Sequence, residues 1–146
     1  MTLPPALKRV RRAVLDTMLL IYVLEDHPHL GTVSEWLLQQ AAEGHYAGLI
    51  TPISMAEVLV KPLQAGRPDL ADRYRTALRN LPGVDLCDLT WQAGAMAGAL
   101  RAKYSLPLPD MLQVAIAIEH DAVLITNDKA LRAVDATDVV LLAELG

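Results

Sequence analysis

The sequence predicts an α/β protein, a three-layer α/β/α sandwich built around a central, mainly parallel, five-stranded sheet. Short apolar runs of strand length alternate along the chain with longer segments that have helical periodicity. The chain has 146 residues and is 53% hydrophobic, which indicates elements that are covered on both sides. Strands that alternate with helices pair in parallel and carry the helices on both faces of the sheet.

Apolar runs predict the strands, and the segments between them predict the helices. The strands are expected at residues 10–16, 47–51, 84–87, 123–126 and 139–142. The helices are expected at residues 17–24, 30–43, 52–62, 70–80, 91–103, 111–120 and 129–133.

Prolines, glycines and capping residues set the helix boundaries. Pro28 disfavours helix at the residue before it, so a loop separates the first two helices. Gly44 ends the second helix, because glycine adopts the left-handed conformation of a helix end. Pro52 fits the start of the third helix, where its missing N–H costs little, and Pro62 marks the end. Thr90 caps the helix that follows the third strand.

The length is that of one domain, spanning residues 1–146, with no internal repeat and no interdomain linker. Residues 1–9 are expected to form a flexible N-terminal arm. Four basic residues at the end of this arm and just after it are expected to be solvated, with a phosphate contact as the alternative: Lys8, Arg9, Arg11 and Arg12.

Composition also restricts the class of function. Cys87 is the only cysteine, which excludes a disulfide within the chain and a thiolate metal cluster. No apolar run reaches the roughly 20 residues of a membrane span, and no signal peptide is recognisable, so a cytoplasmic protein is expected. The net charge is −4. A protein that binds nucleic acid through its overall field is usually basic, so any contact with RNA or DNA must be local.

Four carboxylates fall where the predicted elements place them at one edge of the sheet. Asp16 and Asp128 each follow an apolar strand directly, so both lie at the carboxyl edge, where ligands bind. Asp110 begins a helix after the proline-stiffened connector Ser105–Pro109, and Glu57 lies on the helix that leaves the edge after the second strand. Carboxylates so placed raise each other's pKa or need a cation. A site with only oxygen ligands favours Mg²⁺ or Mn²⁺.

Each carboxylate also has a plainer explanation. Asp16 and Asp110 fit helix caps, and Asp128 fits a turn. Glu57 has Lys61 one helical turn further on as a candidate ion-pair partner. Zinc is not expected, because the histidines show no ligand spacing: His27, His29, His45 and His120.

Four blocks of the sequence together resemble the PIN domain, the small ribonuclease fold found in VapC-type toxins of toxin–antitoxin pairs. The blocks are residues 14–22, 53–59, 106–117 and 124–128, and the resemblance extends from about Val14 to Leu142. It implies a metal-dependent endoribonuclease with a PIN-like fold, the toxin component of such a pair. One departure is Met18, since the family often has Asn at that place.

The resemblance also implies a role for each site residue. Asp16, Asp110 and Asp128 would bind Mg²⁺ or Mn²⁺ directly or through water, and Glu57 would hold a water ligand or a second ion. All four would be catalytic. Thr17 and Thr126 would support these carboxylates by hydrogen bonds.

RNA is the substrate that the resemblance implies, and a small antitoxin protein is the implied partner. A homodimer is also expected, because an apolar stripe is predicted to lie exposed on one helix: Met96, Leu100 and Tyr104. The alternatives are an RNA-processing nuclease outside a toxin–antitoxin pair and a catalytically silent scaffold for RNA or protein. A phosphotransferase of the haloacid-dehalogenase type is disfavoured, because it needs a second Asp where Met18 stands. The receiver type needs an acidic pair at the first strand, which this sequence lacks.

Overall fold

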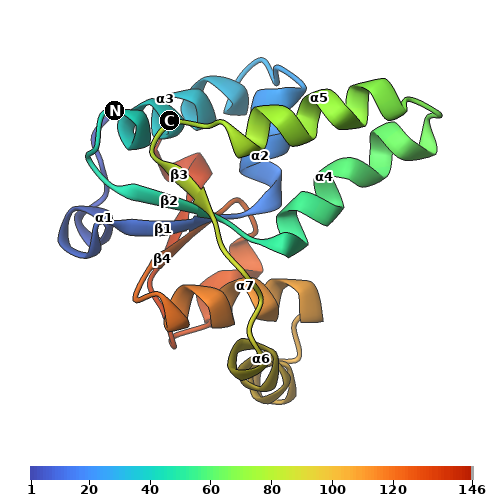
Figure 1. The fold of residues 1–146 in the computed structure, drawn as a ribbon. Coiled ribbons are helices and arrows are strands. Elements are labelled where there is room, and N and C mark those ends of the chain that lie inside the picture. The colour runs from blue at the N-terminus through green and yellow to red at the C-terminus, as the bar shows by residue number, and fades with distance from the viewer. Residues whose placement is uncertain (146) are drawn as a thin grey trace.

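The computed structural model describes residues 1–145 and has a wholly parallel sheet at its centre (Figure 1). The strand order is β3-β2-β1-β4-β5, which confirms the predicted five-stranded α/β fold. The strands are β1 (Arg12–Leu15), β2 (Ala47–Ile50), β3 (Val84–Leu86), β4 (Val123–Thr126) and β5 (Val139–Leu141).

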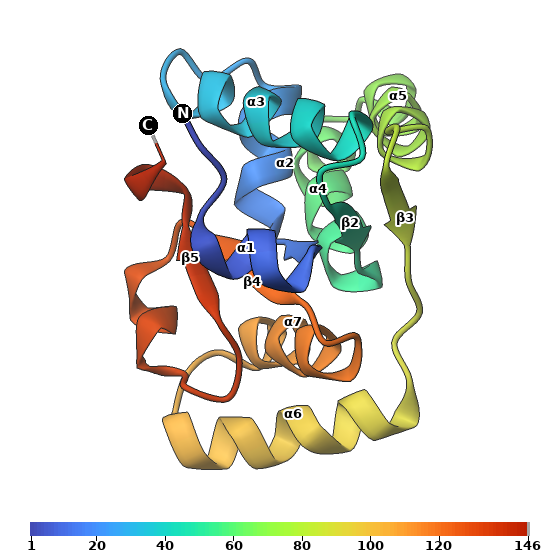
Figure 2. The ribbon, with the colours of Figure 1, turned by 90° about the vertical axis from the view of Figure 1, so that its left-hand side faces the viewer.

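Helices cover both faces of the sheet, as Figure 2 shows. One face carries α2 (Thr17–Leu24), α3 (Leu30–Ala42), α4 (Pro52–Gln64) and α5 (Pro68–Arg79). The other face carries α6 (Trp91–Tyr104) and α7 (Leu108–Glu119). Two short 3-10 helices follow β4 and β5, η1 (Lys129–Ala133) and η2 (Leu142–Glu144). Within residues 1–145, no helix combines the length and the hydrophobicity needed to cross a membrane.

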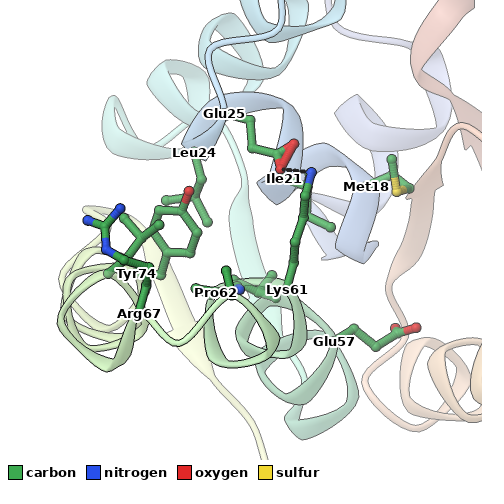
Figure 3. A pocket seen from close by; sticks show the side chains of 12 residues that line it. Met18, Ile21, Leu24, Glu25, Glu57, Lys61, Pro62, Arg67 and Tyr74 are labelled. Atoms are coloured by element: carbon green, nitrogen blue, oxygen red, sulfur yellow. Dashed lines mark hydrogen bonds and ion pairs between the residues drawn. The ribbon is translucent and has the colours of Figure 1, made fainter.

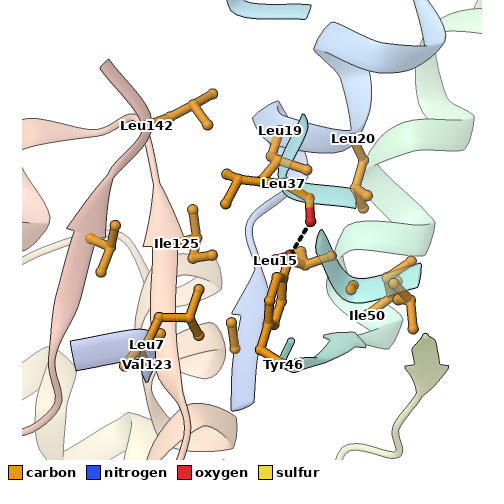
Figure 4. Close-up of a cluster of buried hydrophobic side chains, with 14 of the residues drawn as sticks. Leu7, Leu15, Leu19, Leu20, Leu37, Tyr46, Ile50, Val123, Ile125 and Leu142 are labelled. Atoms are coloured by element: carbon orange, nitrogen blue, oxygen red, sulfur yellow. Dashed lines mark hydrogen bonds between the residues drawn. The ribbon is translucent and has the colours of Figure 1, made fainter. Parts of the chain in front are cut away.

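The alternation of side chains along β1 divides the core into two layers. Ala13 and Leu15 face the core under α2 to α5, whereas Val14 faces the core under α6 and α7. Figure 4 shows the first of these cores, in which the Tyr46 hydroxyl donates a 2.8 Å hydrogen bond to the Leu37 carbonyl. Buried aliphatic side chains fill both cores. A sheet that is covered on both faces needs two such layers, which explains the high hydrophobic content of the sequence.

The N-terminal segment differs from the expected flexible arm. Residues Pro5–Val10 form helix α1, which ends at Arg11 in the left-handed conformation (φ 63°). Leu7 is fully buried in the first core, and Arg9 forms an ion pair with Asp138. In the sequence, Leu7 stands next to basic residues and so gives no apolar pattern. Its burial against the core stabilises the short helix, which would not be stable by itself.

Three helix boundaries also differ from the predicted ones. Helix α4 continues through Pro62, which lies in its last turn, and Ala65 N–H still bonds to the Lys61 carbonyl. Helices α5 and α7 begin earlier than expected, at Pro68 and Leu108, because proline in a first turn needs no N–H partner.

The apolar stripe on α6 is not exposed as the sequence analysis expected. Leu100 is buried, and Met96 and Tyr104 pack partly against the second core beneath α7. The exposed apolar side chains of this region are instead Leu89 and Trp91, the latter 94% exposed. The homodimer itself stays a prediction, and its surface must lie elsewhere than this stripe.

Leu7→Ala should destabilise the protein by roughly 2–5 kcal/mol, the cost of emptying a buried leucine site. Chemical denaturation followed by circular dichroism measures this change. Lys8→Ala is the control on the same helix, since Lys8 is exposed, and should change stability by less than about 0.5 kcal/mol. Equal stability of the two variants would show that residues 1–9 are the flexible arm after all.

Candidate active site

Asp16 lies directly after β1 and is held at the junction of β1 and β4. Its backbone N–H donates to the Ile125 carbonyl at 2.9 Å, which continues the pairing of the two strands. The side chain is 8% exposed. Oδ1 accepts the Thr17 N–H at 2.8 Å, and Oδ2 accepts the Thr126 hydroxyl at 2.7 Å. Asp16 therefore caps α2, as its plainer explanation held, and at the same time presents a carboxylate at the sheet edge.

Glu57 reaches the same edge from α4. Its Oε1 accepts the Thr17 hydroxyl at 2.7 Å, so Thr17 joins Glu57 to the helix that Asp16 caps. The ion pair with Lys61 does not form, because Lys61 pairs with Glu25 at 2.9 Å. Glu57 is thus placed by a hydroxyl rather than neutralised by a neighbouring cation.

Asp110 lies in the first turn of α7, two residues after that helix begins. No side chain caps this helix, so the cap explanation fails for Asp110. The pKa of Asp110 is raised from 3.8 to about 6, first by partial burial and then by the negative charges of Asp16, Asp128 and Glu57, in that order. The structure therefore brings the four predicted carboxylates within electrostatic reach of one another.

Asp128 follows β4 and caps η1. Its Oδ1 accepts the Ala130 N–H at 3.0 Å, and its own N–H donates to the Thr126 hydroxyl oxygen at 3.1 Å. Because Thr126 also donates to Asp16, this one threonine links two of the four carboxylate residues. Thr17 and Thr126 both lie where the sequence analysis expected supporting groups.

Three further polar residues of the site were not predicted from the sequence. Thr51, Ser54 and Gln113 are each at most 1% exposed and are hydrogen-bonded together. Ser54 also contacts the Thr17 hydroxyl, with 3.0 Å between the oxygens. One signal was present in the sequence, because Gln113 interrupts the apolar run Met111–Ala117. A buried amide in such a run needs polar partners.

The donor set agrees with Mg²⁺ or Mn²⁺ in chemistry and in charge. The edge offers only oxygen atoms, and no Lys or Arg in residues 1–145 forms an ion pair with any of the four carboxylates. Across the same residues, no three Asp, Glu, His or Cys side chains already form a metal-binding group. The carboxylates would therefore have to reorient to bind a cation. Such binding would relieve the repulsion between Asp110 and the other three carboxylates.

An apolar groove of about 420 Å³ opens beside this edge, between α2, α4 and α5 (Figure 3). Glu57 and Met18 lie at one end, and Arg67 and Tyr74 lie at the other. Met18 is 42% exposed, so the position that departs from the family pattern presents an apolar surface next to a carboxylate. The groove is therefore continuous with the acidic edge.

Comparison with known proteins places these features in a family. A family model described as PIN domain matches residues 13–137. None of the curated proteins matches the chain.

Several solved structures are similar in fold. VapBC2 from Rickettsia felis, bound to a promoter DNA fragment, has a TM-score of 0.75 and 17% identity, covering 89% of this chain and 98% of that chain. A toxin-antitoxin complex from Klebsiella pneumoniae has a TM-score of 0.68 and 26% identity, covering 89% and 97%. FitAcB from Neisseria gonorrhoeae has a TM-score of 0.71 and 17% identity, covering 91% and 99%.

The raised pKa of Asp110 predicts that the metal-free protein loses stability as pH rises between about 4 and 6. In that window the folded chain keeps a proton that the unfolded chain has released, so ionisation disfavours the folded state. Asp110→Asn should therefore melt at a higher temperature than the wild type at pH 7, and at a similar temperature at pH 4. Thermal melts in EDTA measure the difference.

Asp85→Asn, at an exposed carboxylate on the edge strand β3, is the control and should show no such pH-dependent gain. An Asp110→Asn variant that melts below the wild type at pH 7 would contradict the electrostatic origin of the effect.

Proposed function

The chain belongs to the PIN domain family, and from this premise we propose that it is a Mg²⁺- or Mn²⁺-dependent endoribonuclease, the toxin of a toxin–antitoxin pair. The observation that carries the proposal is the mutual electrostatic influence of Asp16, Glu57, Asp110 and Asp128 at one sheet edge. A protein gains nothing in stability from gathering four unneutralised carboxylates, so their convergence points to a bound cation.

Asp16, Asp110 and Asp128 would hold the ion. When bound, it would lower the pKa of a water molecule and offset the charge that develops on the scissile phosphate. The chain's own contribution is orientation. Thr126 fixes Asp16 Oδ2, and Thr17 fixes Glu57 Oε1, so these carboxylates keep their positions while substrate binds. Glu57 Oε1 is engaged by Thr17, so its other oxygen would be the one to hold a water molecule at the site.

Two alternatives within the family remain to be separated by experiment. A catalytically silent scaffold would not need the carboxylates, yet all four are present, and two of them, Asp16 and Glu57, accept hydrogen bonds from threonine hydroxyls. An RNA-processing nuclease outside a toxin–antitoxin pair would use the same site. The two active classes therefore differ in partner and in cellular effect rather than in catalytic residues.

The groove supports the proposal of an antitoxin. It is lined mainly by apolar side chains from three helices and ends at Glu57, so a partner's apolar segment would lie in it. A basic side chain of that segment would then reach the four carboxylates, since a guanidinium pairs with carboxylates through two hydrogen bonds. The similar structure from Klebsiella pneumoniae is, by its name, a toxin-antitoxin complex. An inhibitor of this kind would compete with the metal.

A homodimer is part of the proposal, with a surface on α6 in place of the stripe expected from the sequence. Trp91 is exposed at the start of this helix, and Gly94 and Gly98 leave open space where side chains would stand. An exposed aromatic beside a flat helix face is a surface on which a second copy can pack closely.

Asp16→Asn should reduce RNA cleavage by the purified protein more than about a hundredfold, since loss of a supporting residue alone costs 10- to 100-fold at metal sites. Gel assays on a defined RNA measure the change, and EDTA should abolish wild-type cleavage until Mg²⁺ or Mn²⁺ is restored. Asp85→Asn serves as the control and should cut as the wild type does. Cleavage that persists in EDTA would refute a metal-dependent mechanism.

Expression of the wild-type chain alone should slow the growth of its host, because uncontrolled RNA cleavage is harmful. The Asp16→Asn variant, expressed to the same level, should leave growth unchanged. Growth curves with matched immunoblots make the comparison. Normal growth with an active wild-type enzyme would favour the RNA-processing alternative over the toxin.

A further inference from the structure

Gln113 has no part in the proposed chemistry, yet it lies beneath two of the four carboxylate residues. We infer that Gln113 is a positioning residue, whose side-chain amide sets Asp16 directly and Glu57 through the hydroxyls of Ser54 and Thr17. The inference rests on the proposed function, because it assigns these carboxylates to a metal-dependent site.

The amide of Gln113 is buried and uses both of its ends. Its Oε1 accepts the Thr51 hydroxyl at 2.5 Å, and its Nε2 donates to Ser54 Oγ at 2.6 Å. The same nitrogen lies 3.4 Å from Asp16 Oδ1. A side chain that is 1% exposed and has three polar neighbours is fixed in place.

The surrounding groups determine which way the amide points. Thr51 Oγ1 already accepts the Ser54 N–H at 3.2 Å as the cap of α4, so its single proton is free for Gln113 Oε1. Turning the amide over would place an oxygen opposite the carboxylate oxygen of Asp16, where two acceptors repel. The nitrogen therefore faces Asp16 and Ser54.

The hydroxyls then have one consistent direction of donation. Thr17 gives its proton to Glu57 Oε1 at 2.7 Å, so it must accept at the contact with Ser54, 3.0 Å away. Ser54 gives its proton to Thr17 and accepts from Gln113, since the Leu15 carbonyl is farther, at 3.5 Å. Four groups thus form a chain of donors that begins at Gln113 and ends on the Glu57 carboxylate.

This chain joins the two helical layers of the molecule. Gln113 comes from α7 on one face of the sheet, whereas Ser54 and Glu57 come from α4 on the other. Asp16 stands between them, after the central strand β1. A shift of α7 relative to α4 would therefore move the carboxylates with respect to one another, and the amide resists that shift.

The first test measures Mn²⁺ binding to the full-length protein without RNA, by electron paramagnetic resonance of the free ion. Gln113→Met keeps an unbranched side chain of similar length and removes both polar ends. It should weaken Mn²⁺ binding by about 10- to 100-fold, as supporting residues of metal sites do. Ile116→Ala is the control, since it removes a buried side chain of the second core on the same helix and leaves the chain of donors intact. It should lower the melting temperature while Mn²⁺ affinity stays near that of the wild type.

Ser54→Ala is the second variant, because alanine fits the site and cuts the chain between Gln113 and Thr17. It should also weaken Mn²⁺ binding. The double variant Gln113→Met/Ser54→Ala should lose less than the product of the two single losses, since both act on one chain. A purely structural role would give no such coupling at matched melting temperature.

The inference is overturned if Gln113→Met binds Mn²⁺ as tightly as the wild type, or if the losses of the two single variants multiply in full. If Gln113→Met does not fold, unaltered Mn²⁺ binding by Ser54→Ala overturns it. RNA cleavage is scored separately. A wild type that binds Mn²⁺ and cuts no RNA refutes the proposed function, while the affinities of the variants still decide the role of Gln113.

Discussion

The buried carboxylate of Asp16 is the constraint on which the rest of the site depends. An ionised group that is 8% exposed is tolerated only when hydrogen bonds replace the water that it has lost. Thr17 and Thr126 supply these bonds from the next residue and from the end of β4. The requirement therefore fixes how β1, α2 and β4 meet, and every other carboxylate of the site is placed relative to that junction.

The four carboxylates at this edge repel one another, and this repulsion lowers the stability of the folded chain. The pKa of Asp110 is raised partly by three other carboxylates, and Lys61, the cation that could have paired with Glu57, is already paired with Glu25. The apolar layers on both faces of the sheet must supply the stability that this repulsion removes. Sites that bind ligands commonly carry such a cost, which is relieved when the ligand arrives.

The sequence allowed the sheet and the four carboxylates to be predicted, because both follow from local patterns. Asp16 and Asp128 come directly after apolar strands, and parallel pairing brings such positions to one edge. The meeting of Gln113 with Ser54 has no local signature, since it depends on how two helices pack across the sheet. The burial of Leu7 also depends on packing between elements. It was missed because the prolines and basic residues around Leu7 give no apolar pattern. The pattern of apolar and polar residues therefore predicts the helices and strands, but it does not predict which side chains from different elements meet.

The order in which the ribosome releases the chain has a consequence for this arrangement. Thr126, which holds Asp16, is synthesised 110 residues after it, and Asp128 follows later still. The central strand β1 therefore waits for β4, its partner on one side, until most of the chain has been made. The groove is lined by side chains between Met18 and Tyr74, which all emerge before Asp110 and Asp128. A nascent chain thus presents the residues that line the groove while its acidic edge is still incomplete.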